Sequence, residues 1–191
     1  MLTQLGFNSP RPFVRLMCIA SFLVILLVVF ACKSGRTRLT PGQRPPDFVL
    51  PDLAGVETTL NDFRGKLLVL NFWGTWCEPC VAEMPALQRL QNQLGERGLQ
   101  VLAISVNDSQ DNLRRFKRRH NLTFPLLYDA SGEIGEKYGL TGVPETFVID
   151  QEGRLVLMPD LESGQPLVRV VGPRRWDSRR AIVRFTRLLE K

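Results

Sequence analysis

Two uninterrupted apolar runs, separated by a stretch of helical periodicity, dominate the middle of the chain. Residues 65–73, GKLLVLNFW, and 99–107, LQVLAISVN, are almost continuously hydrophobic, as expected of strands buried on both faces of a sheet. Between them, apolar residues from Met84 to Leu94 recur at spacings of three and four. This spacing predicts a helix that ends at about Arg97, before Gly98.

Shorter elements flank these three. Before the first apolar run we expect two short strands in 47–60, around a turn at Ala54-Gly55. After the second run we expect a helix capped by Ser109, a short strand at 124–129 and a brief helix at Ile134–Tyr138. The chain should end with a strand pair in 146–158 around Glu152-Gly153, a strand at 167–172 and a final helix at Asp177–Glu190. Strands alternate with helices before a hairpin and a last helix close the chain. This order predicts an α/β fold with a sheet covered on both faces.

The N-terminal segment, residues 1–32, has the pattern of an export signal. Arg11 and Arg15 precede residues 16–32, LMCIASFLVILLVVFAC, which carry no charge. The apolar run is near the lower limit for a membrane-spanning helix, about 17 residues, and its end resembles a bacterial lipoprotein cleavage site. An uncleaved anchor and a lipid on Cys32 both remain open. Either one predicts that the rest of the chain lies on a bacterial cell membrane, outside the cytoplasm.

Composition indicates how the chain is divided into domains and argues against nucleic-acid binding. Residues 33–46, KSGRTRLTPGQRPP, are polar and rich in proline and glycine, which predicts a linker between the anchor and a single domain at 47–191. The formal charge is +6, with no dense basic block interleaved with aromatic residues. We therefore expect no nucleic-acid binding.

The candidate chemistry lies in NFWGTWCEPC, residues 71–80. A structural zinc site needs about four thiolate or imidazole ligands. The other two cysteines lie in the export segment and His120 is the single histidine. We therefore expect neither a metal nor a Cys–His nucleophile pair, and His120, on the apolar side of its helix, is expected to be a packing residue.

Two features of this cysteine pair favour redox exchange over a purely structural disulfide. A bridge between Cys77 and Cys80 closes a very short loop, so it removes little chain entropy and stabilises weakly. In addition, a strand opens here directly into a helix, which puts Cys77 at the helix N-terminus, where free backbone N–H groups and the helix dipole favour the thiolate. Cys80, one turn further on, is shielded and can attack a mixed disulfide formed at Cys77.

At these residues the chain resembles the thioredoxin superfamily, and within it the membrane-anchored TlpA/ResA/DsbE-like branch of cytochrome c maturation. The similarity rests on FWGTWCEPC with the flanking GKLLVLNFW and VAEMP, and on PPDFVLPDLAG, TTLNDFRGK and YGLTGVPETFVIDQEGR. It extends from about Pro41 to the C-terminus. The resemblance implies a thioredoxin fold, a central mixed sheet flanked by helices, with an N-terminal strand extension, a membrane anchor and no cofactor.

The resemblance also implies a substrate-binding surface beside the cysteines. Val143-Pro144 is expected to be a cis peptide, with the Val143 backbone free to pair with an incoming substrate strand. Trp76, and Glu145 directly after the proline, are expected to contribute to the same surface.

Proton transfer needs a titratable group, and the residue at the expected position is Asn71. Thioredoxin has a buried Asp there, and an Asn cannot titrate. Glu83 matches an active-site glutamate of the ResA-like proteins, and Glu145 matches an acidic position of the DsbE-like proteins. In a partly buried cleft either carboxylate could have a raised pKa and exchange a proton with Cys80; a solvated surface charge is the alternative for each.

The expected activity is an extracytoplasmic thiol-disulfide oxidoreductase. By resemblance it would reduce disulfides in exported proteins, such as the haem-binding CxxCH of apocytochrome c, and a membrane thiol reductant would restore its dithiol. A disulfide oxidase or isomerase, a thiol peroxidase and a non-enzymatic binding module remain alternatives. Residues 157–166, LMPDLESGQP, lengthen the final hairpin relative to the compact family form, and we assign them no partner from the sequence.

Overall fold

The computed structural model describes residues 39–190. The expected anchor at 1–32, with Cys32, and the first part of the expected linker lie outside the described residues. Among the helices that the structure does describe, none is long and apolar enough to cross a membrane.

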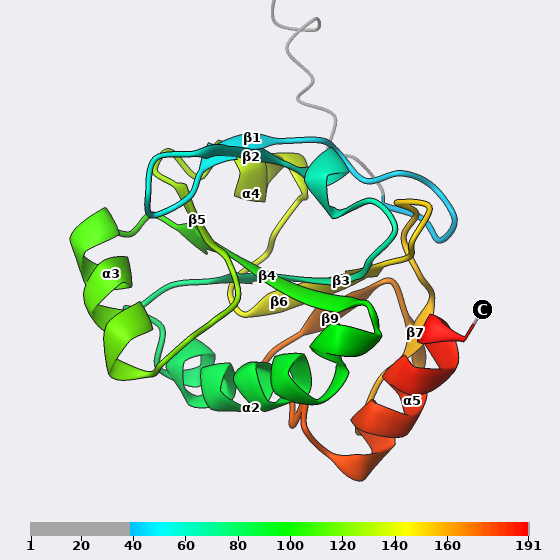
Figure 1. Cartoon of the computed structure of the whole chain (residues 1–191). Helices are drawn as coiled ribbons and strands as arrows, with labels where there is room; N and C mark the ends of the chain where they lie inside the picture. Colours follow the sequence, from blue (N-terminus) through cyan, green and yellow to red (C-terminus); the bar gives the residue numbers. More distant parts are fainter. Residues whose placement is uncertain (1–38, 191) are drawn as a thin grey trace, which may run out of the picture. The chain divides into compact units, whose positions relative to one another are not determined.

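A five-stranded mixed sheet in the order β5-β4-β3-β6-β9 forms the centre of the domain (Figure 1). Its strands are β3 (Leu67–Trp73), β4 (Leu99–Val106), β5 (Leu126–Asp129), β6 (Glu145–Ile149) and β9 (Arg169–Val171). The pairs β3–β4 and β4–β5 are parallel, and β3–β6 and β6–β9 are antiparallel. Both expected apolar runs are strands of this sheet, and every residue of β3 is buried because layers cover both of its faces. The fold is the thioredoxin fold that the sequence predicts.

Each face of the sheet carries its own layer (Figure 1). On one side lie α2 (Glu78–Leu94), α3 (Gln110–Arg119) and α5 (Arg179–Leu189), with η2 (Gly95–Arg97) after α2. On the other side lie α4 (Glu133–Lys137), η1 (Leu60–Phe63) and the hairpin of β1 (Val49–Pro51) and β2 (Glu57–Thr59). The hairpin confirms the two short strands expected around Ala54-Gly55.

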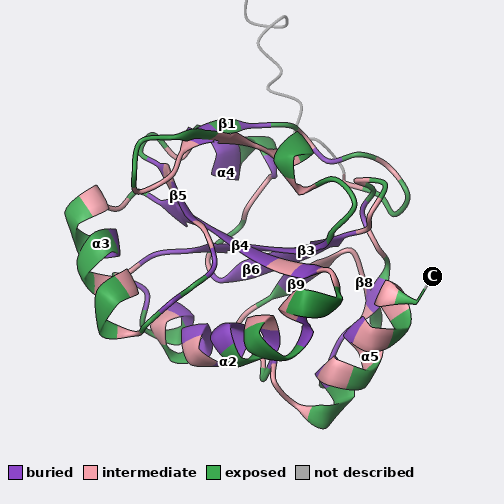
Figure 2. Ribbon diagram, viewed as in Figure 1, coloured by how far each residue is buried: buried purple, intermediate pink, exposed green. Residues whose placement is uncertain are grey.

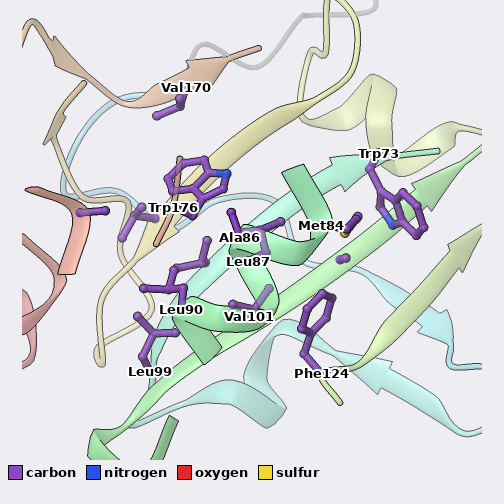
Figure 3. Close-up of a cluster of buried hydrophobic side chains, with 14 of the residues drawn as sticks. Trp73, Met84, Ala86, Leu87, Leu90, Leu99, Val101, Phe124, Val170 and Trp176 are labelled. Carbon is purple, nitrogen blue, oxygen red and sulfur yellow. The ribbon is translucent and has the colours of Figure 1, made fainter. Parts of the chain in front are cut away.

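Alternating side chains of β3 supply the two halves of the core. Leu67, Val69 and Trp73 pack towards α2, whereas Leu68 and Phe72 pack towards the opposite layer. Burial therefore follows the central strands and the inner side of α2 (Figure 2). Figure 3 shows the cluster on the α2 side of the sheet, with Trp73, Met84, Leu87 and Trp176 among its labelled side chains.

Residues that precede Asp47 already contact the domain. The Gly42 N–H donates to the Leu155 carbonyl at 2.7 Å, and the Leu155 N–H donates to the Gln43 carbonyl at 2.8 Å. The Tyr138 hydroxyl donates to the Pro46 carbonyl at 2.8 Å. The last residues of the expected linker are therefore held on the domain.

The strand expected after Glu152-Gly153 is shorter than the sequence suggests. Only Leu155 bridges back to the end of β6, because β9 pairs with the remaining edge of that strand. The chain then leaves the sheet and forms a separate two-stranded hairpin, β7 (Met158–Pro159) and β8 (Pro166–Leu167). This hairpin, residues 158–167, holds most of the unassigned 157–166 segment.

Candidate active site

The two cysteines lie where the central strand passes into α2. Cys77 is the N-cap of α2, with an extended backbone, and its Sγ accepts the Cys80 N–H at 3.3 Å. Pro79 lies in the first turn, where no intrahelical hydrogen bond is lost. The two cysteines form a disulfide. Cys77 is 6% exposed and Cys80 is 0% exposed, so Cys77 is the more accessible residue of the pair.

Asp108 anchors the turn that leads into the cysteine pair. Its carboxylate accepts the Thr75 N–H at 2.7 Å, the Thr75 hydroxyl at 3.0 Å and the Ser105 hydroxyl at 3.2 Å. Although burial opposes ionisation, hydrogen bonds from Thr75 and Ser109 lower the pKa of Asp108 below its ordinary value. Trp76, which follows Thr75 and directly precedes Cys77, is 59% exposed.

The loop before β6 approaches the same disulfide. Val143-Pro144 is a cis peptide, which confirms the expectation from sequence. The Val143 carbonyl oxygen lies 3.6 Å from the Sγ of Cys77. The backbone of this loop and the more accessible sulfur therefore lie together, as a substrate strand would require.

Glu145 is fully buried and holds this loop. Its Oε1 accepts the Thr141 N–H at 2.8 Å, the Thr141 hydroxyl at 2.6 Å and the Gly142 N–H at 3.2 Å, and its Oε2 lies 3.3 Å from Nη1 of Arg169. Side chains alternate along β6, so Glu145 points away from the layer of α2, towards which Thr146 points. The contacts of Glu145 are thus with the loop and with Arg169, on the side of the sheet opposite Cys80.

Glu83 lies one helical turn after Cys80 on the buried face of α2 and is only 3% exposed. Its Oε1 accepts the Asn71 amide at 2.9 Å, and its Oε2 accepts the Trp176 indole N–H at 2.9 Å and the Arg174 backbone N–H at 3.1 Å. Burial raises the pKa of Glu83, and these three hydrogen bonds with the charge of Arg174 offset part of that rise. The alternative of a solvated surface charge is therefore wrong for Glu83.

Sequence reasoning missed Trp176 and Arg174 as partners of this carboxylate. They lie 93 and 91 residues from Glu83 along the chain, and no local pattern links positions so far apart. One signal was present, since Trp176 is a large ring within the polar segment GPRRWDSRR and needs a buried partner.

Other candidate sites are not supported. Within residues 39–190 no group of three or more His, Cys, Asp or Glu side chains could hold a metal ion. His120 is half-buried and stacks on Phe116 with ring centroids 4.1 Å apart, which confirms that it is a packing residue.

Three features of the structure define a class of protein: a mixed five-stranded sheet, a cysteine pair at the N-terminus of the helix that follows its central strand, and a cis proline against that pair. Together they define a thioredoxin-fold thiol-disulfide oxidoreductase.

Comparisons with known proteins agree with this class. The model of the AhpC/TSA family matches residues 41–158. The chain is 42% identical over 120 residues to the thiol-disulfide oxidoreductase ResA of Geobacillus thermodenitrificans, covering 63% of this chain and 69% of the relative. It is 34% identical over 145 residues to ResA of Bacillus cereus, covering 71% and 84%. The chain belongs to the AhpC/TSA family and, within it, to the ResA-like thiol-disulfide oxidoreductases.

Solved structures show the same relationship. A protein described as the thiol:disulfide interchange protein DsbE of Chlorobium tepidum has a TM-score of 0.67 and 28% identity, covering 79% of this chain and 99% of the other. A secreted thiol-disulfide isomerase of Corynebacterium glutamicum has a TM-score of 0.62 and 27% identity, covering 78% and 87%.

Proposed function

We propose that this oxidoreductase works as a reductant of disulfides in exported proteins, with Cys77 as the attacking and Cys80 as the resolving cysteine. The observation that carries the proposal is the asymmetry of the pair. Cys77 caps α2 and keeps exposed surface, whereas Cys80 is fully enclosed. A helix N-terminus stabilises a thiolate, so the accessible sulfur is also the more nucleophilic one.

The reaction begins from the dithiol and transfers two electrons. The Cys77 thiolate attacks one sulfur of the substrate disulfide; the substrate S–S bond breaks, and its other sulfur leaves as a thiolate that takes up a proton. Cys80 then loses its proton and attacks Cys77 in the mixed disulfide. The second substrate sulfur leaves, and the products are a reduced substrate and the Cys77–Cys80 disulfide.

Glu83 is suited to take the proton of Cys80. Residues three apart on a helix are neighbours, with Cβ atoms about 5–6 Å apart, and both side chains are buried on the same side of α2. A carboxylate whose pKa is raised by burial accepts a proton at a pH nearer to neutrality than an exposed one does. Asn71 donates to Glu83 and, having no acidic proton, leaves the titration to that carboxylate.

Substrate binding falls to the surface around Cys77. In this proposal the backbone of Val143, before the cis Pro144, pairs with an extended substrate segment. The exposed Trp76, which directly precedes Cys77, lines the same surface depression as Val143. In this proposal Glu145 acts on substrate through the loop that it fixes. The candidate substrate is the CxxCH disulfide of apocytochrome c, and the candidate electron donor is a membrane thiol reductant. The ResA relatives are named thiol-disulfide oxidoreductases, which supports the type of reaction.

The proposed location is the outer face of a bacterial membrane. The basic and apolar pattern of residues 1–32 supports it, and so does the secreted relative from Corynebacterium glutamicum. An uncleaved anchor and a lipid on Cys32 remain the two forms of attachment to test.

Trapping tests the proposed function. In a Cys80→Ser variant the mixed disulfide at Cys77 has no resolving thiol, so the substrate should stay attached and be identifiable by mass spectrometry. Cys77→Ser is the matched control and should trap nothing. A reduction potential near −120 mV, typical of a strong oxidant such as DsbA, would contradict a reducing role, and turnover of peroxide would favour the peroxidase alternative.

The role of Glu83 is tested separately by alkylation of the reduced protein across a pH series, with the adduct on Cys80 distinguished from that on Cys77 by fragmentation of the peptide that carries both. Glu83→Gln should remove the carboxylate-dependent step from the Cys80 profile. A Cys80 profile unchanged by this substitution would refute proton transfer by Glu83.

A further inference from the structure

We infer that the β7–β8 hairpin, residues 158–167, is a positioning element for Glu83, because its Asp160 fixes Arg174 over the carboxylate that serves Cys80. This inference rests on the proposed function of Glu83 and assigns a role to a segment that no sequence pattern explained. The link consists of two consecutive contacts, each with defined atoms.

The first contact joins the hairpin to Arg174. Nε of Arg174 donates to Oδ2 of Asp160 at 2.8 Å, and both side chains are largely buried. Oδ1 of Asp160 is occupied within the hairpin turn, where it accepts the backbone N–H groups of Glu162 and Ser163 and the Ser163 hydroxyl. Although burial opposes ionisation, these bonds and Arg174 lower the pKa of Asp160 far below its ordinary value, so it stays charged at neutral pH.

The second contact joins Arg174 to Glu83. The Arg174 backbone N–H donates to Oε2 of Glu83 at 3.1 Å, and two residues later the Trp176 indole donates to the same oxygen at 2.9 Å. The hairpin also contributes Met158 and Leu161 to the core cluster that contains Trp176. The segment that supplies both donors is therefore held to the hairpin by the Asp160–Arg174 pair and by apolar packing, and Arg180 at the start of α5 adds hydrogen bonds to the Leu161 and Glu162 carbonyls.

Among the described residues, Arg174 is the charged group that lowers the pKa of Glu83. The side chains of Asn71 and Trp176 are neutral donors. A surface depression of about 300 Å³ reaches Glu83, and its charged lining consists of Arg89, Glu162, Arg174, Arg175 and Asp177. Arg89 is paired with Asp177 at 2.7 Å. The Asp160–Arg174 pair can thus set how firmly the carboxylate is held and how easily it takes a proton.

Asp160→Asn breaks the first contact selectively. The new amide can keep its oxygen in the turn, but its nitrogen then presents a donor to the Arg174 Nε, which is also a donor. Adding Arg174→Gln to this variant places an amide oxygen at about the depth of the lost Nε, so the new asparagine can donate to it and restore a link without charge. Asp129→Asn is the matched control, since Asp129 is another buried aspartate that accepts backbone N–H groups, from Ile134 and Gly135 in α4.

The test follows Cys80 alkylation against pH in the reduced full chain. In Asp160→Asn the Glu83-dependent step should move to higher pH, because release of the segment takes the Arg174 N–H and the Trp176 indole away from the carboxylate. The substitution also removes the negative charge of Asp160, but that charge is not among the groups that shift the pKa of Glu83, so the lost hydrogen bonds decide the direction. In the double variant the Arg174 charge is absent, so the step should stay above that of wild type, and the restored link is judged from exchange of the Trp176 indole N–H. The single variant Arg174→Gln, which leaves the hairpin turn intact, should also move the step upward and serves if Asp160→Asn does not fold.

A readout independent of the chemistry is hydrogen exchange of the Trp176 indole N–H, observed by NMR. Exchange should be faster in Asp160→Asn than in Asp129→Asn, since the donor segment is released. Identical Cys80 profiles and indole exchange in these two variants would overturn the inference, as would a double variant whose indole exchange is no closer to wild type than that of Asp160→Asn. If Glu83→Gln keeps the step in the Cys80 profile, the proposed proton role fails, and indole exchange still decides whether the hairpin holds the segment.

Discussion

Replacing Glu83 by Gln should stabilise the oxidised protein progressively as the pH rises. The wild-type carboxyl has a pKa raised above 4.5, its value in an unfolded chain, chiefly by burial. The folded state therefore holds this proton more tightly than the unfolded state does. Wild-type stability falls as the pH rises from about 4.5 to the folded pKa, because folding then requires burial of a charge. The Gln variant has no such proton and is free of this loss.

The magnitude follows from the single proton involved. One proton changes the free energy of unfolding by at most about 1.4 kcal/mol per pH unit. The stability difference between variant and wild type should therefore grow by up to that amount per unit inside the window and become constant above the folded pKa. Asp108, Asp160 and Asp177 have pKa values lowered below 3.8, so their stabilising charges are lost only in more acidic solution and do not enter this window.

The site can accept a Gln side chain. Its Oε1 can take the donors from Arg174 and Trp176, and its Nε2 then faces Asn71. The Oδ1 of Asn71 has no hydrogen-bond partner among the described residues, and rotation of that amide would turn an acceptor towards Nε2. The Thr146 hydroxyl, which now accepts from Asn71 at 3.0 Å, can donate instead.

The assay is urea unfolding of the disulfide form between pH 4 and 9, which keeps both cysteines from titrating. Glu96→Gln, an exposed position after α2, removes the same charge and is the control. A difference between Glu83→Gln and wild type that stays constant across this range would refute the reasoning, since it would mean that folding does not change the proton affinity of Glu83.

Three further outcomes are expected from other contacts. Trp176→Phe keeps a buried ring but removes a hydrogen-bond donor to Glu83. It should lower the free energy of unfolding, measured with urea, by about 1–3 kcal/mol. It should also raise the pKa of Glu83, measured from the pH profile of Cys80 alkylation. Asp108→Ala frees the Thr75 turn and should lower stability by about 1–3 kcal/mol; an unchanged urea midpoint would contradict the anchoring role. Leu87→Ala leaves a cavity beneath the sheet and should cost about 2–5 kcal/mol, with the Cys80 alkylation profile unchanged wherever the protein is folded.

Local patterns were sufficient to predict much of the fold. The apolar runs gave β3 and β4, the spacing from Met84 to Leu94 gave α2, and the position of the CxxC pair between strand and helix placed Cys77 at the N-cap. Each of these features depends on neighbours within a few residues. The cis state of Val143-Pro144 came from resemblance, because nothing local to those residues selects it.

Long-range contacts could not be predicted in the same way. The surroundings of Glu83 come from β3 and from the segment before α5, and the facing direction of Glu145 depends on the register of β6 against β3. The sequence indicates both glutamates as possible proton acceptors, with Glu83 expected among the catalytic residues and Glu145 on the substrate-binding surface. Alternation along β6 separates them, since it puts one on each side of the sheet.

The unequal exposure of the two sulfurs has a consequence for the order of events during turnover. In the proposed cycle Cys77 is the more exposed cysteine, so the reductant and the substrate would both react at Cys77 and would occupy the same site, one after the other. The two half-reactions are then mutually exclusive, and an excess of either partner should slow the other's step. Flux through such a protein would depend on the ratio of the two partners as well as on their amounts, because both would react at the same cysteine.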